Sequence, residues 1–326
     1  MKNYLISLAV LSVALLTVSG CGNSEGAVGN SAAKKKLYWI QGMKGHPVHQ
    51  LTQIGFNEGC KKLGYEMVVV GADTDDLNAT LQLADQALAN GDAAGFAIWA
   101  NSPGYNPFIE RASAKHIPVV IPHFPSPEGS IPGVTGVISC DPAEYAEKAA
   151  LEIGKLMSGK GTVAVTQGGF NPTENRVAEI FRKSMSEKYP EVKVLPTELE
   201  GFDLGAASTK AASILQANPG LTAALSTTGG GASAWAQALR DSGRKMVVVG
   251  MDYTRINLDL VKNGDVYAVI GQPLWDESFG AAELLDKATR GEKIPAWTRL
   301  EAPLITKDNL EPFQKLMDKV EAAVRR

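Results

Sequence analysis

The chain has 326 residues, of which 44% are hydrophobic and 21% are charged, and its formal net charge is −3. This length exceeds one ordinary domain and suits two. The small net charge excludes strong electrostatic attraction to nucleic acid or to an anionic membrane surface. The apolar fraction is sufficient for two packed cores.

The first twenty residues have the pattern of an export signal. Lys2 supplies a positive charge, residues 4–17 are mainly apolar, and small residues precede Cys21. The apolar run is too short for a transmembrane helix, which needs about 20 apolar residues. We therefore expect residues 1–20 to be a signal peptide.

The tetrapeptide Val-Ser-Gly-Cys that ends at Cys21 resembles the lipobox of bacterial lipoproteins. The resemblance implies cleavage before Cys21 and a diacylglycerol group on its sulfur, so that the chain is anchored to a membrane. An ordinary signal peptide with a chance cysteine is the alternative. Residues 21–36 are mostly small and polar, which predicts a flexible tether, and the folded body is expected to begin near Leu37.

Beyond the tether, short apolar runs alternate with longer stretches of helical periodicity. The runs are continuous in hydrophobicity, which indicates strands covered on both faces, as in a parallel sheet. The expected strands are residues 37–40, 67–70, 95–99, 118–121, 162–165, 222–225, 246–249 and 267–270.

The segments between these runs predict amphipathic helices. Residues 77–88 carry one apolar stripe at helical spacing, and residues 146–157 carry another. Asp141-Pro142 precedes the second stripe and supplies an N-cap acceptor followed by a residue suited to the first turn. Repeated strand–helix units predict a doubly wound α/β fold. The expected strands are too many for one short sheet, so we expect two similar lobes.

Several short motifs follow one another along the body of the chain. They are His46-Pro47-Val48-His49, Gly55-Phe56, Leu63-Gly64-Tyr65, Ile117-Pro118-Val119, Gly201-Phe202-Asp203, Val249-Gly250-Met251-Asp252 and Gly271-Gln272. Their order and spacing, from about Leu37 to about Thr306, resemble the type I periplasmic sugar-binding proteins of the ribose-binding group.

The resemblance implies two similar doubly wound parallel-sheet lobes joined by a three-strand hinge, with crossings near Cys140, Gln272 and Glu301. The lobes implied are residues 37–140 plus 273–301 for the N-terminal lobe and residues 141–272 plus 302–326 for the C-terminal lobe.

The function implied is that of an exported substrate-binding lipoprotein of an ABC transporter. Such a protein captures a small polar solute (a sugar, a polyol or a sugar-like molecule) between its lobes and delivers it to permease subunits. We expect a monomer, on the outer face of the cytoplasmic membrane or in the periplasm. A ligand-sensing subunit for a membrane signalling receptor would use the same cleft and is the alternative.

Ligands of open α/β sheets bind at the carboxyl ends of the strands, which selects the residues that follow each run. By the resemblance, Asp252 and Gln272 match hydrogen-bonding positions and Phe202 matches an aromatic residue that packs on the ligand ring. Asp252 has a second interpretation as the N-cap of a helix beginning near Thr254. The candidate contacts are His46, His49, Trp99, His123 and Phe124 from the first lobe, with Asn175, Arg176, Phe202, Thr228, Asp252 and Gln272 from the second lobe and hinge.

Some positions depart from the family pattern. His123-Phe124 stand where many sugar binders have an Asp-Arg pair, and Asn175, beside Arg176, replaces a later arginine. Thr228 takes the place of a polar pair after its strand. These departures favour a smaller, less hydroxylated or partly apolar ligand.

Two further chemistries compete with this interpretation. His46, His49 and His123 together suit Zn²⁺ or Cu²⁺. The glycine run at residues 229–231 provides either a close backbone turn or, with Arg176, a cradle for an anion.

Other functional classes receive no support from the sequence. No Gly-x-Ser-x-Gly elbow follows an expected strand, and no carboxylate pair stands in a recognisable local motif. We therefore expect a binding protein without enzymatic activity and without a cofactor. An export signal stands where related repressors carry a DNA-binding helix-turn-helix, so we expect no nucleic-acid binding. Cys60 and Cys140 are expected to be buried thiols, with a disulfide as the alternative.

Overall fold

The computed structural model describes residues 35–124 and 131–324. The predicted signal peptide, Cys21 and the predicted tether up to residue 34 lie outside the described residues. Within the described part of the chain, no helix is both long and apolar enough to cross a membrane.

The first sheet has six strands in the order β12-β5-β4-β3-β1-β2, and every neighbouring pair is parallel. Its strands are β1 (Lys36–Ile40), β2 (Glu66–Val70), β3 (Ala93–Ile98), β4 (Val119–Pro122), β5 (Gly136–Cys140) and β12 (Trp297–Leu300). Four of them coincide closely with the first four apolar runs of the sequence.

The second sheet has seven strands, six of them in the order β13-β11-β10-β9-β6-β7, with β8 paired to β6. All pairs are parallel except that of β11 with β13. Its strands are β6 (Gly161–Gln167), β7 (Val192–Val194), β8 (Glu198–Leu199), β9 (Leu221–Ser226), β10 (Val247–Met251), β11 (Ala268–Ile270) and β13 (Leu304–Ile305).

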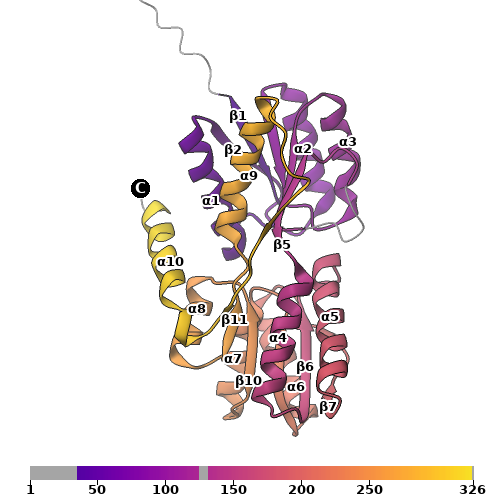
Figure 1. The fold of residues 1–326 in the computed structure, drawn as a ribbon, viewed down its shortest axis with the longest axis vertical. Helices are drawn as coiled ribbons and strands as arrows, with labels where there is room; N and C mark the ends of the chain where they lie inside the picture. Colours follow the sequence, from indigo (N-terminus) through magenta and orange to yellow (C-terminus); the bar gives the residue numbers. More distant parts are fainter. Residues whose placement is uncertain (1–34, 125–130, 325–326) are drawn as a thin grey trace, which may run out of the picture. The chain divides into compact units, whose positions relative to one another are not determined.

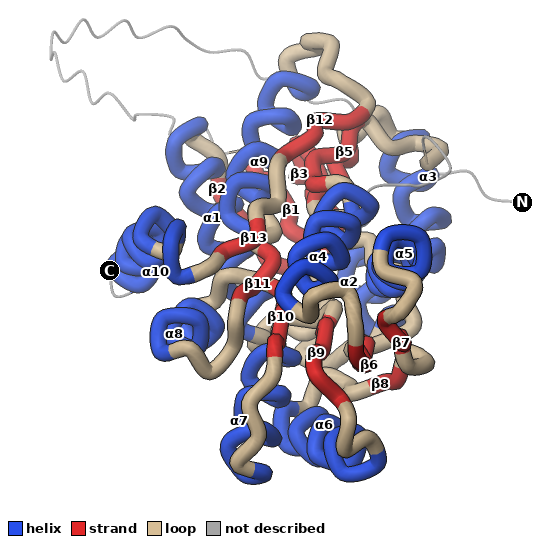
Figure 2. Tube along the Cα trace, turned by 60° about the horizontal axis from the view of Figure 1, so that its bottom comes forward, coloured by secondary structure: helices blue, strands red, loops and turns tan. Residues whose placement is uncertain are grey.

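Helices cover both faces of each sheet (Figures 1 and 2). In the first lobe, α1 packs against α9 on one face, and α2 and α3 lie on the other. In the second lobe, β10, β9 and β6 run between the α4–α5 pair and the α6–α7 pair (Figure 2). The helices are α1 (Pro47–Leu63), α2 (Leu77–Asn90), α3 (Asn106–Ala114), α4 (Pro142–Leu156), α5 (Pro172–Lys188), α6 (Leu204–Ala217), α7 (Gly231–Ser242), α8 (Arg255–Asn263), α9 (Leu274–Thr289) and α10 (Glu311–Val324).

The continuous apolar runs follow from this double cover. Leu37 and Trp39 of β1 pack into the core on the α1–α9 side, while Tyr38 and Ile40 pack into the core on the α2–α3 side. Successive strand residues point to opposite faces of the sheet. Because both faces of this sheet are buried, every position of the run is apolar. The predicted fold class, two doubly wound parallel-sheet lobes, is confirmed.

The start of α4 shows how local sequence sets a helix boundary. The Asp141 side chain accepts a hydrogen bond from the backbone N–H of Ala143 at 2.9 Å, and Pro142 occupies the first turn. The apolar stripe that follows, from Ala146 to Ile153, is fully buried against the second sheet. The predicted cap and helix are therefore present.

Three short connections link the two sheets (Figure 1). The chain passes from β5 to α4 after Cys140, from β11 to α9 through residues 271–273, and from β12 to β13 through residues 301–303. For each of the three connections, the strand before it and the next strand after it belong to different sheets. We retain the lobe boundaries given above as a proposal.

Gly71, which directly follows β2, lies close to the backbone of Gln41, which directly follows β1. Its φ is +150°, and a Cβ built there would lie 1.8 Å from the carbonyl oxygen of Gln41. We predict that Gly71→Ala lowers the free energy of unfolding by roughly 2–4 kcal/mol, because backbone strain and overpacking add.

Gly91→Ala is the matched control, since Gly91 also has a positive φ (+73°) but nothing lies within 4 Å of its added Cβ. Gly91→Ala should lower the free energy of unfolding by only about 1 kcal/mol. Urea unfolding of both variants measures the difference, and equal losses would contradict the predicted clash.

Candidate functional site

A cleft lies where the carboxyl ends of strands from both sheets meet. Its empty volume is about 640 Å³, which includes space that opens to solvent. The lining residues are Met43, His46, Val48, His49, Trp99, Asn101, His123, Phe124, Tyr145, Asn171, Thr173, Glu174, Val177, Phe202, Thr227, Thr228, Gly229, Asp252 and Gln272.

Aromatic rings from the first lobe form one wall of the cleft. Trp99 directly follows β3 and stacks on His123, with ring centroids 4.3 Å apart and planes at 12°. Phe124 meets Trp99 edge to face at 5.2 Å, and His49 lies 5.3 Å from Trp99 on another side. These contacts hold the rings in fixed positions, so the wall is preorganised.

His49 is held as a neutral ring. Its Nδ1 lies 2.8 Å from the carbonyl oxygen of Gly42, and burial lowers its pKa to about 4. A carbonyl only accepts, so Nδ1 carries the proton and Nε2 is left as an acceptor. His46, whose ring centroid is 5.3 Å from that of His49, has a buried Nδ1 without a partner.

His123 is paired with a carboxylate from a distant part of the chain. Its Nδ1 lies 2.8 Å from Oε1 of Glu277, a fully buried residue of α9. Burial alone would lower the pKa of His123, but the charge and hydrogen bond of Glu277 outweigh it and raise that pKa above its ordinary value. The backbone of His123 has a φ of +73°, which turns the chain at the end of β4.

Asp252 combines an unusual backbone conformation with a buried, unpartnered carboxylate oxygen. It follows β10 with a φ of +69°, it is only 4% exposed, and its Oδ1 is buried without a hydrogen-bond partner. Burial raises its pKa to about 7, against the attraction of His123. An unpartnered buried carboxylate oxygen is costly, so it marks a position where a ligand donor is expected.

The structure separates the two interpretations of Asp252. Thr254 caps α8 instead, since its side chain accepts a hydrogen bond from the backbone N–H of Asn257. Asn257 in turn donates its side-chain amide to the carbonyl oxygens of Met251 and Asp252, at 2.8 and 3.1 Å. The loop is thus held by its backbone, and the Asp252 carboxylate is left for the cleft.

Other predicted residues complete the lining. Gln272 lies on a connection between the lobes and donates from Nε2 to the hydroxyl of Tyr145 at 3.2 Å. Phe202 packs over Gly168 and remains 40% exposed. Thr228 follows β9 and is buried.

Two predicted contacts lie elsewhere. Asn175 accepts a hydrogen bond from the side chain of Gln167 at 2.8 Å, and Arg176 pairs with Glu179 at the surface. Neither lines the cleft. The reason is helical geometry, because α5 begins at Pro172 and each residue turns the side-chain direction by about 100°.

The residue that takes their place is Glu174, which the sequence analysis missed. It accepts hydrogen bonds from the backbone N–H of Gly168 at 2.7 Å, from Asn171 Nδ2 at 2.7 Å and from Thr227 Oγ1 at 3.0 Å. Burial raises its pKa despite these donors. The sequence signal that could have found it is Asn171-Pro172, an N-cap followed by a first-turn proline.

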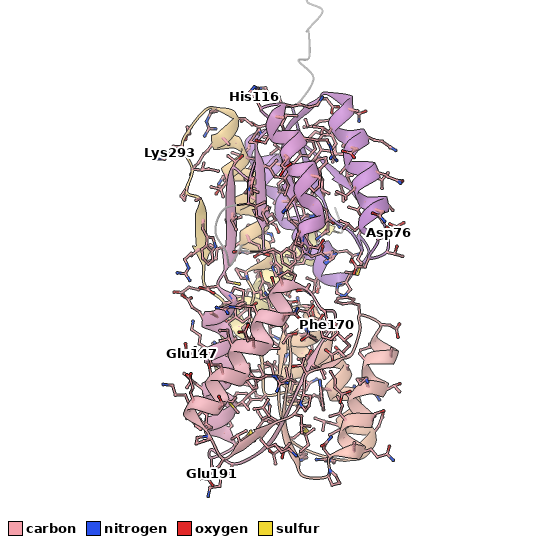
Figure 3. The ribbon with its side chains drawn as sticks, turned by 90° about the vertical axis from the view of Figure 1, so that its right-hand side faces the viewer. Asp76, His116, Glu147, Phe170, Glu191 and Lys293 are labelled. Atoms are coloured by element: carbon pink, nitrogen blue, oxygen red, sulfur yellow. The ribbon has the colours of Figure 1, made fainter. Side chains whose placement is uncertain are left out.

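The loop that leads into α5 reaches the cleft. Phe170, labelled in Figure 3 near the junction of the two lobes, is 70% exposed, and the next residue, Asn171, lines the cleft. The turn thus brings Asn171, Thr173 and Glu174 to the site together.

The metal alternative is not supported. Within residues 35–124 and 131–324, no group of three or more histidine, cysteine or acidic side chains is arranged to hold a metal ion. Trp99 contacts both His49 and His123, and His123 uses its Nδ1 on Glu277. Cys60 and Cys140 are both free and buried, so the alternative of a disulfide is wrong.

Comparison with known proteins places this geometry in a family. Residues 38–293 match the model of the periplasmic binding protein domain. The chain belongs to this family.

Two relatives in the family have known roles in import. The D-apiose import binding protein of Actinobacillus succinogenes is 26% identical over 249 residues, covering 75% of this chain and 79% of the relative. The ribose import binding protein RbsB of Bacillus subtilis is 24% identical over 312 residues, covering 93% and 98%.

A solved structure has the same fold. It is an ABC transporter solute-binding protein from Burkholderia graminis in complex with D-arabinose, with a TM-score of 0.79 and 22% identity. The match covers 85% of this chain and 97% of that one.

The pairing of His123 with Glu277 is testable by titration. We predict that Glu277→Gln lowers the pKa of His123, because it removes the strongest opposition to burial, while the weaker effects of Asp252 and Glu174 remain. Nuclear magnetic resonance of the imidazole nitrogens measures this directly. The titration of His49 should stay low as an internal control, and an unchanged His123 pKa would refute the pairing.

The raised pKa of Asp252 predicts a pH-dependent stability. The folded protein holds the proton more tightly than the unfolded chain does, so the free energy of unfolding falls as pH rises from 3.8 to about 7. We predict that Asp252→Asn raises it by roughly 1–4 kcal/mol at pH 8 and changes it little at pH 4.

Urea unfolding at both pH values measures this effect. Asp259→Asn, the same exchange at an exposed position of α8, should have no effect at either pH. An equal gain from Asp252→Asn at the two pH values would show that ionisation of this carboxyl is not the cause.

Proposed function

We propose that the chain is the substrate-binding protein of an ABC transporter and captures a sugar or sugar-like solute in the cleft. The observation that carries the proposal is a cleft lined from both sheets by aromatic rings and by polar side chains. Flat rings suit the apolar faces of a sugar, and carboxylate, amide and imidazole groups suit its hydroxyls.

The relatives support this class of ligand. Two are named for the import of apiose and ribose, and the solved structure with the same fold contains D-arabinose. Aldopentoses are small molecules with several hydroxyls, and the cleft lining supplies hydrogen-bonding side chains and aromatic rings for them.

The contacts we assign to the ligand are those that line the cleft. Asp252 and Gln272 accept and donate hydrogen bonds, while Trp99, Phe124 and Phe202 provide the apolar surfaces. His46, His49, His123 and Thr228 complete the set of predicted contacts, and Glu174 with Asn171 joins it from the structure.

Binding is coupled to a movement of the lobes in this proposal. The three connections between the sheets act as a hinge, and a ligand that bridges both lobes favours the form in which they close on it. Closure would then present surfaces from both lobes to the permease subunits. The ligand leaves unchanged, and we assign no catalytic role to any residue.

Export and anchoring complete the proposal. The pattern of residues 1–20 supports export, and the lipobox-like tetrapeptide supports lipid attachment at Cys21. We propose that the body acts as a monomer outside the cytoplasmic membrane. A sensing role beside a membrane receptor would use the same cleft and stays a prediction.

Titration calorimetry of the full chain tests the ligand class. We predict saturable binding, at one site per chain, of at least one member of a panel of D-ribose, D-arabinose, D-apiose, D-tagatose and the matching polyols. A ligand at 100 times its dissociation constant should also stabilise the chain by about 2.7 kcal/mol. Absence of binding across the panel would contradict the proposal.

Two variants test the assigned cleft. Trp99→Leu and Gln272→Ala should each weaken binding of the sugar found in this way by about tenfold or more, since each removes a contact worth about 1.4 kcal/mol. Trp275→Leu is the control, because Trp275 lies on α9 outside the lining. Unchanged affinity in both cleft variants would place the ligand elsewhere.

A further inference from the structure

We propose that the solute carries a positively charged amino group, which binds the Asp252 carboxylate inside the aromatic-lined cleft. This inference rests on the proposed function and specifies its ligand as an amino-substituted sugar or polyol. It follows from the charges around the cleft and from a buried carboxylate oxygen in its lining, Oδ1 of Asp252, that lacks a partner.

Asp252 provides the anchor. Its side chain lines the cleft, it is 4% exposed, and its Oδ1 is buried without a hydrogen-bond partner. Its backbone is fixed by Asn257, so the carboxylate does not reach a partner by a shift of the loop. A donor from the ligand is therefore the missing partner.

The cleft offers no cation to balance this carboxylate. None of its lining residues, all from the described part of the chain, is a lysine or an arginine. Lys44 pairs with Asp73 at 3.4 Å and Arg176 pairs with Glu179 at 3.7 Å, both outside the lining. A second carboxylate, Glu174, lines the cleft and receives its hydrogen bonds from neutral groups.

The imidazole of His123, which also lines the cleft, is already paired. His123 attracts Asp252, but its Nδ1 bonds to Glu277, whose charge acts on Asp252 in the opposite direction. Three carboxyl groups, those of Asp252, Glu174 and Glu277, therefore lie in or beside the cleft with one paired imidazole, so acidic groups are in excess. A neutral ligand leaves that excess buried, whereas an ammonium group compensates it.

The aromatic wall favours the same group. Trp99 and Phe124 line the cleft beside His49 and His123, and Phe202 lines it from the second lobe. Aromatic faces attract ammonium ions through their quadrupole, with the strongest effect at tryptophan. A carboxylate or phosphate on the ligand would meet only repulsion from Asp252 and Glu174, so sugar acids are disfavoured.

Matched ligands test the proposal. Titration calorimetry of the full chain would compare D-glucose, D-glucosamine, N-acetyl-D-glucosamine and D-glucuronate, and likewise ribitol, 1-amino-1-deoxyribitol and ribonate. We expect one of the two ammonium compounds to bind about tenfold or more tightly than its hydroxyl counterpart. The acetamide keeps the nitrogen without its charge and should lose that gain, and the acids should bind weakest.

A variant identifies the group responsible. Asp252→Asn should abolish the preference for the ammonium member over the hydroxyl member, while Asp259→Asn on the exposed face of α8 should retain it. Circular dichroism would verify that both variants are folded. A preference that survives in Asp252→Asn would overturn the assignment to this carboxylate.

The result also separates this inference from the proposed function. Neutral sugars or polyols that bind as tightly as their ammonium partners, or more tightly, would overturn the inference and leave the proposed function intact. If neither series nor the neutral panel binds, both proposals fail.

Discussion

Most residues of the cleft owe their position to one constraint, the common direction of parallel strands. In each lobe the strands that line the cleft end at the same edge, so the loops after β1, β3 and β4 meet in one lobe and those after β6, β9 and β10 meet in the other. Helices cover both faces of each sheet, so we expect the solute at this edge and not on a sheet face. The arrangement of the strands thus sets the position of the cleft, whichever side chains line it.

Several side chains near that edge lower the stability of the folded chain. Asp252 is buried with one oxygen unpartnered, and Glu277 lies fully buried with one oxygen on His123 and the other without a partner. Such groups are costly in a dry interior and are tolerated where a ligand completes their hydrogen bonds. The left-handed backbone of His123 and Asp252 adds strain at two strand ends, one in each sheet, that line the cleft. Strain and unpartnered charge therefore concentrate in the cleft.

The sequence predicts the lobes well because double cover forces continuous apolar runs, which are visible without any structure. It also predicts most of the residues that line the cleft, since the end of a strand fixes the position of the residue that follows, as at Trp99 and Asp252. Asn175 and Arg176 were predicted to line the cleft but do not. Within a helix, the direction of a side chain depends on the residue at which the helix begins, which the sequence did not specify closely enough. Glu277 was not predictable at all, since it meets His123 across 154 positions of sequence through tertiary packing alone.

Hydrogen exchange of the full chain, with and without a saturating sugar or amino sugar, tests the central claim that one solute bridges two sheets. The account predicts slower exchange in both lobes at once, in residues 42–49 and 99–101 of the first and in residues 168–174 and 227–229 of the second. Protection confined to a single lobe, or located away from these strand ends, would contradict it.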